Sequence, residues 1–132
     1  MIPKHSILRI ARPTDNLAVV SRMYIEGLGF ELLGSFSEHD GFDGVIIGHP
    51  FHTYHLEFTH HKSERVGSAS TQDNLLVFYI PDQQAWANAC EKMLCAGFNS
   101  VTSYNPYWDM RGSTFEDVDG YRVVLQNSEW KV

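Results

Sequence analysis

The chain has 132 residues, 43% of them hydrophobic and 20% charged, which is the composition of one globular domain and excludes a disordered or fibrous chain. Its net charge of −6 and its scattered Lys and Arg residues argue against a nucleic-acid partner, because phosphate binding requires clustered cations. No apolar run reaches the ~20 residues of a membrane span, and the N-terminus lacks the apolar stretch of a signal peptide. We therefore expect a cytoplasmic protein with no membrane partner.

A strand is predicted over 7–12, because this segment is rich in apolar residues and stops at Pro13. Thr14 or Asp15 is expected to cap a helix that ends at Gly29, where a left-handed residue belongs. The inner face of this helix is formed by apolar residues at helical spacing, namely Leu17, Val20, Tyr24 and Leu28. Strands over 30–36, 45–48 and 54–59 follow, with Asp-Gly turns between the first two, and the polar residues 62–73 form a linker.

The second half of the chain repeats this order of elements. A strand over 75–80 stops at Pro81, and Asp82 is expected to cap a helix that ends at Gly97. The inner face of this helix is formed by Trp86, Ala89, Cys90 and Met93. Three more strands are predicted over 98–104, 113–115 and 121–126.

The two halves share landmarks at a nearly constant offset, since Asp15 and Gly29 in the first half recur as Asp82 and Gly97 in the second. This repetition predicts a single α+β domain over residues 1–132 made of two tandem βαβββ modules. Module one spans residues 1–61, the linker 62–73 and module two 74–132. We expect the paired modules to form a curved mixed sheet around a central cavity, with the helices outside.

Three segments resemble the vicinal-oxygen-chelate superfamily, which includes glyoxalases, bleomycin-resistance proteins and extradiol dioxygenases. They are the helix end Tyr24-Ile-Glu-Gly-Leu-Gly-Phe30, the strand His55-Leu-Glu-Phe-Thr59, and the turn and final strand from Asp117 to Leu125. Each pattern is weak alone, but their order and spacing are fairly specific for the fold. The resemblance covers nearly the whole chain and says little about the reaction.

Metal-dependent members of this superfamily take ligands from the first and last strands of each module. Carried over by position, Glu57 matches an oxygen ligand, whereas the other three positions fall at Arg9, at Asn74 or Leu75, and at Val124. Every His residue lies at or before position 61, so module two contains none. The resemblance therefore implies a fold without the usual metal site, and we expect no cofactor.

A rearranged metal site is the alternative for this cofactor prediction. His55 and Glu57 share one face of a strand at i, i+2, and imidazole with carboxylate is a set that binds Zn, Ni, Mn or Fe. Surface histidines are the simpler interpretation of this His-rich segment. Acidic residues such as Asp117 and Asp119 could complete a site, but a turn beside a final strand is expected to face water.

The favoured interpretation is a metal-free, small-molecule-binding protein of the glyoxalase and bleomycin-resistance type, with a role in sequestration or resistance. Its pocket is expected to be lined by Arg9, Glu57, Asn74, Tyr107, Trp108 and Val124. Superfamily relatives often dimerise, so the resemblance implies a homodimer. The alternative is a metal-dependent lyase, isomerase or dioxygenase whose ligands and catalytic group are rearranged around Glu57, and a third possibility is a partner protein with a vestigial pocket.

Overall fold

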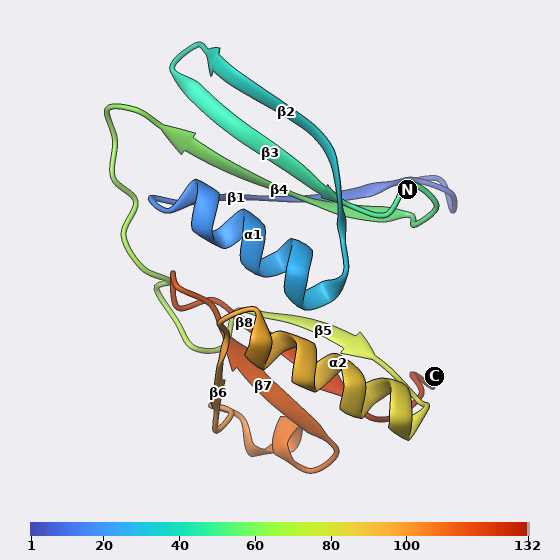
Figure 1. Cartoon of the computed structure of the whole chain (residues 1–132). Coiled ribbons are helices and arrows are strands. Elements are labelled where there is room, and N and C mark those ends of the chain that lie inside the picture. Colours follow the sequence, from blue (N-terminus) through green and yellow to red (C-terminus); the bar gives the residue numbers. More distant parts are fainter. Residues whose placement is uncertain (132) are drawn as a thin grey trace.

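The computed structural model describes residues 1–131, so Val132, the last residue of the predicted module two, lies outside the described residues. Figure 1 shows two α/β units joined by an extended linker. The elements are, in chain order, β1 (Leu8–Pro13), α1 (Leu17–Leu28), β2 (Glu31–His39), β3 (Phe42–Gly48), β4 (Tyr54–His61), β5 (Leu75–Tyr79), α2 (Gln83–Cys95), β6 (Asn99–Val101), the 3₁₀ helix η1 (Pro106–Asp109), β7 (Gly112–Glu116) and β8 (Arg122–Gln126).

Each unit forms its own four-stranded mixed sheet, and the two sheets have equivalent topology. The strand orders are β1-β4-β3-β2 and β5-β8-β7-β6, with β1 parallel to β4 and β5 parallel to β8. The prediction of an α+β fold made of two tandem βαβββ modules is therefore confirmed. No helix within residues 1–131 is both long and apolar enough to cross a membrane.

The strands differ from the prediction mainly in their lengths. β2 and β3 meet in a tight hairpin at Asp40 and Gly41, whose φ angles of 52° and 86° are those of a two-residue primed turn. The predicted strand over 98–104 is shorter, because only Asn99–Val101 pairs with β7 and the chain then turns into η1.

The helix caps were predicted correctly for α2 and wrongly for α1. Asp82 accepts a hydrogen bond from the backbone N–H of Ala85 at 2.8 Å, as an N-cap should. The N-cap of α1 is Asn16, which makes no capping bond. The Asp15 carboxylate instead accepts from the backbone N–H groups of Val66 and Gly67, at 3.0 and 2.9 Å, and so holds the linker.

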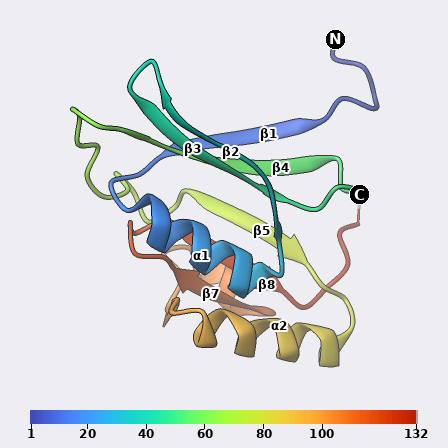
Figure 2. The same ribbon diagram turned by 45° about the horizontal axis from the view of Figure 1, so that its top comes forward.

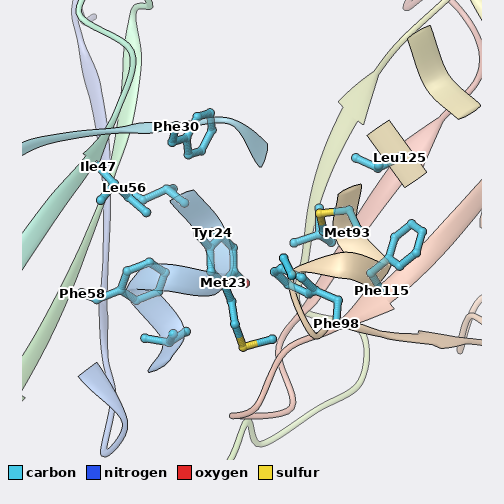
Figure 3. Close-up of a cluster of buried hydrophobic side chains, with 13 residues drawn as sticks. Met23, Tyr24, Phe30, Ile47, Leu56, Phe58, Met93, Phe98, Phe115 and Leu125 are labelled. Carbon is cyan, nitrogen blue, oxygen red and sulfur yellow. The ribbon is translucent and has the colours of Figure 1, made fainter. Parts of the chain in front are cut away.

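Both helices contribute to a core shared by the two modules, α1 with five buried residues and the largely exposed α2 with Met93. In Figure 3, α1 stands between the first sheet and the second module, with Tyr24 facing Phe58 on one side and Phe98 on the other. One apolar cluster contains residues from both sheets and both helices. Figure 2 shows that α1 lies next to the first sheet and that α2 lies farther from this sheet.

This placement decides which face of each sheet belongs to the shared core. Leu56 and Phe58 on β4 point into the core, so the intervening His55 and Glu57 lie on the opposite, outward face. Val123 and Leu125 on β8 likewise belong to the core, which places Val124 on the outward face of the second sheet. Glu57 and Val124 therefore lie on different sheets, each on the face turned away from the shared core.

Candidate functional site

Arg9, His55 and Glu57 form a cluster on the outward face of the first sheet, here called the Arg9 cluster. β1 runs parallel to β4, and the register puts Arg9 beside His55 and Ala11 beside Glu57. The Nε–H of Arg9 donates to Nδ1 of His55 at 3.3 Å, and its Nη1 lies 3.5 Å from Oε1 of Glu57. The predicted ion pair between Arg9 and Glu57 is therefore present.

Both contacts of Arg9 are long, and the guanidinium is partly free. The Arg9 side chain is 44% exposed, whereas the Glu57 side chain is 15% exposed. Since a guanidinium carries five N–H donors, Arg9 keeps donors for a ligand after contacting its two neighbours. The arrangement can hold an acidic group at Arg9 and a hydroxyl or amine donor at Glu57.

The Arg9 cluster does not fit a divalent metal as it stands. His55 and Glu57 supply two donor groups, and no set of three or more His, Cys, Asp and Glu side chains within residues 1–131 could hold an ion. Arg9 contacts both donors, so an entering ion would meet a permanent cation at the same place. We therefore derive no chemical step through a metal at this site.

The other predicted site residues lie on module two. Val124 is fully buried, and Asn74 is exposed just before β5. Tyr107, which is exposed, and the half-buried Trp108 belong to η1, and their rings meet edge to face with centroids 5.0 Å apart. Of the predicted site residues, the structure therefore places Arg9 next to Glu57, and Tyr107 next to Trp108. The first pair lies on the first sheet and the second pair in η1 of module two, and neither lines the two cavities between the modules.

A buried polar network that joins the two modules was missed. The Tyr24 hydroxyl donates to Oδ2 of Asp117 at 2.7 Å, and the Thr14 hydroxyl donates to Oδ2 of Asp119 at 2.6 Å. Nη1 of Arg12 lies 3.9 Å from Oδ2 of Asp117. The prediction that this acidic turn faces water is wrong, because both aspartates are only 4% exposed.

Burial and hydrogen bonding have opposite effects on the pKa of the Asp117 carboxyl. Burial is the larger effect and raises this pKa, whereas hydrogen bonds from Tyr24 and from the backbone N–H groups of Asp119 and Tyr121 lower it. Burial and the adjacent Asp117 raise the pKa of Tyr24, so the phenol stays protonated and can donate. Thr14 and Asp119 are 105 residues apart, so no local spacing could reveal their contact.

Family models match both halves of the chain. The YycE-like N-terminal domain matches residues 8–59, and the YycE-like C-terminal domain matches residues 73–127. The uncharacterized protein YycE of Bacillus subtilis (strain 168) is 44% identical over 122 residues, which cover 92% of this chain and 88% of YycE.

Solved structures show the same fold. A YycE protein of unknown function from Bacillus subtilis matches with a TM-score of 0.88 and 42% identity, covering 97% of this chain and 93% of that one. Glyoxalase I of Leishmania major matches with a TM-score of 0.70 at 17% identity, over 92% of this chain and 86% of that chain. The fosfomycin resistance protein FosX of Mesorhizobium loti matches with a TM-score of 0.74 at 11% identity, over 98% and 94%. The chain therefore belongs to the YycE-like family, and it shares its fold with glyoxalase I and with FosX.

Proposed function

We propose that this protein binds a small molecule carrying an acidic group, at the Arg9 cluster and without a divalent metal. The observation that carries the proposal is the half-exposed guanidinium of Arg9, which contacts both His55 and Glu57. By resemblance, this is the position where metal-dependent relatives hold a cation. A role in sequestration or resistance is supported by the fold shared with FosX, a fosfomycin resistance protein.

The ligand's acidic group is the feature that the Arg9 cluster selects. Arg9 is about three times as exposed as Glu57, at 44% against 15%, so an incoming ligand meets the cation first. A guanidinium binds carboxylate and phosphonate groups through parallel N–H donors. This local preference outweighs the net charge of −6, because exposed charges farther than about 10 Å are screened by salt.

A second copy of the chain is proposed to complete the pocket. The Arg9 cluster lies on the outward face of the first sheet, and the exposed Tyr107 lies beside Trp108 in η1, which contacts β7 of the second sheet. A homodimer that pairs these faces would bring planar rings over the ligand, which provide apolar area at low entropic cost. Sedimentation equilibrium should give twice the mass of 15.1 kDa, whereas a monomer at all concentrations would contradict the pairing.

The binding test is a calorimetric titration of chelator-treated protein with fosfomycin, a small phosphonate, and with the cationic glycopeptide bleomycin. We expect the acidic compound to bind and Arg9→Gln to weaken its binding by about 1.5–3 kcal/mol, the usual value for a charged hydrogen bond. Arg22→Gln, at an exposed position on α1, is the matched control. Binding of neither compound, or binding that Arg9→Gln leaves unchanged, would contradict the proposal.

A metal-dependent lyase, isomerase or dioxygenase is the second candidate. One observation favours it, namely that His55 and Glu57 share the outward face of β4. This function requires a metal ion to displace Arg9 from His55 and Glu57 and to bind a third donor group. Calorimetric titration of the chelator-stripped protein with divalent metals separates the two candidates.

A further inference from the structure

A cavity of about 390 Å³ lies between the two modules, on the core side of the sheets and away from the Arg9 cluster. Its walls come from the C-terminal end of α1, the start of β4, β5 and one side of α2. A second cavity of about 210 Å³ shares Tyr54 and Phe78 with it and continues along β1 and β5. The larger volume lies within the range of natural small-molecule sites, which is about 300–1,000 Å³.

The inner wall of the larger cavity is aromatic. Phe30, Tyr54 and Phe78 meet in a triangle whose ring centroids are 6.1 to 6.3 Å apart. The ring of His52 stacks on Tyr54 at 5.1 Å and extends this wall toward the mouth, where His52 is exposed. Such a wall offers apolar area to a hydrocarbon chain or ring.

Lys92 is the permanently charged side chain that lines the cavity. Lys92, in the last turn of α2, and His52 are exposed lining residues, and no Asp or Glu within residues 1–131 lines the cavity. This is unusual for a chain with 16 acidic and 10 basic residues. The cavity is therefore electrostatically suited to an anion, whereas most of the surface repels one.

A further hydrogen-bonding group is available on the wall. The hydroxyl of Tyr54 makes no hydrogen bond with any group of residues 1–131 and belongs to a half-buried ring. Burial raises the pKa of Tyr54, so the hydroxyl keeps its proton as a donor. An apolar ligand with one polar end would satisfy this group, which a plain hydrocarbon would leave unpaired.

We propose that this cavity is a second ligand site, which binds an amphiphilic monocarboxylate. The hydrocarbon part lies along Phe30, Tyr54 and Phe78, and the carboxylate reaches Lys92 at the mouth. The inference is independent of the function proposed for the Arg9 cluster, because the two sites lie on opposite faces of the first sheet and share no residue.

The test is a calorimetric titration of the whole chain with decanoate and with decyltrimethylammonium, which has the same chain length and the opposite charge. We expect decanoate to bind at one saturable site. The affinity for decyltrimethylammonium should be lower by about tenfold or more, because this probe loses one charge-assisted contact. Lys92→Gln should abolish this difference. Lys131→Gln, at an exposed lysine outside the cavity, is the control and should preserve it.

A second pair of variants tests the location. Ala85→Trp puts a large ring on a lining residue of α2, whereas Ala87→Trp puts it on an exposed residue of the same helix that does not line the cavity. Ala85→Trp should abolish decanoate binding and Ala87→Trp should leave it intact. Absence of a saturable site, binding that survives Ala85→Trp, or equal affinity for both probes would overturn the proposal. Loss of binding in Arg9→Gln would instead assign decanoate to the Arg9 cluster and overturn it too.

Discussion

Arg9 and Arg12 stand three positions apart on β1 and show how burial changes the value of an ion pair. The side chain of Arg9 is 44% exposed beside Glu57, so water screens the pair. The side chain of Arg12 is 9% exposed and that of Asp117 is fully buried. Arg12 also lies over the ring of Tyr121, with its guanidinium carbon 3.8 Å from the centroid. Removing either arginine leaves a carboxylate without its cationic partner, but only the carboxylate of Asp117 is then buried away from water.

Arg12→Met should therefore lower the free energy of unfolding by about 3–5 kcal/mol, the usual cost of removing one partner of a buried pair. Arg9→Met, the matched control on the same strand, should cost about 1 kcal/mol or less. Urea denaturation followed by tryptophan fluorescence measures both values. Equal losses in the two variants would contradict the role assigned to the buried network.

Asp15 makes the attachment of the linker dependent on pH. Backbone donors at Val66 and Gly67 lower the pKa of Asp15 below its ordinary value of 3.8. A lowered native pKa means that the carboxylate stabilises the folded chain above the unfolded pKa, and this contribution is lost as pH falls through the native value. The amide shifts of Val66 and Gly67 in NMR spectra should titrate with a midpoint below 3.8. In Asp15→Asn that titration should disappear, and a midpoint at or above 3.8 in the unmodified chain would refute the attachment.

The contact between α1 and α2 depends on a small residue. Gly27 is buried on α1, and a Cβ built there would lie 2.9 Å from Cε1 of Phe98 and 3.0 Å from Sδ of Met93. The two helices contact each other in the common core, where added volume strains the packing. Met93 is fully buried, so its side chain has little room to move aside.

Gly27→Val should destabilise the protein by about 1–3 kcal/mol, as expected for overpacking. Gly34→Val is the control, because a Cβ at Gly34 meets only Cδ1 of Ile46, at 3.8 Å. Thermal denaturation of both variants provides the measurement. An unchanged melting temperature in Gly27→Val would show that α1 and α2 separate easily. Such a result would contradict the tight packing of the two helices in a shared core.

Periodicity and turn residues predicted the elements well, since they depend on neighbours in the sequence. The predicted inner face of α1 is confirmed, with Val20 and Tyr24 fully buried, and so is the cap at Asp82. The burial of Asp117 was missed because its partners, Tyr24 and Arg12, lie in the other module. Contacts between modules leave no local pattern, so the sequence did not reveal the packing of α1 against α2.

At the scale of the whole molecule, the core lies between the modules and the Arg9 cluster lies on the outward face of the first sheet. The pairing of Arg9 with Glu57 could be predicted from alternation on two adjacent strands. Whether that cluster meets Trp108 and Tyr107 depends on a second copy of the chain, which no spacing within one sequence can show. A central cavity between the modules was predicted, but its lining residues come from elements far apart in the sequence, so the sequence did not identify them.

The central claim, that the Arg9 cluster works without a divalent metal, is tested most directly by calorimetric titration of chelator-stripped protein with Ni²⁺, Zn²⁺, Mn²⁺ and Fe²⁺ near neutral pH. The comparison with Glu57→Gln separates this cluster from weak binding by the surface histidines near His49 and His52. We predict no metal binding tighter than micromolar that depends on Glu57. Stoichiometric binding tighter than micromolar in the unmodified protein, lost in Glu57→Gln, would contradict the claim and make a metal-dependent lyase or dioxygenase the better account.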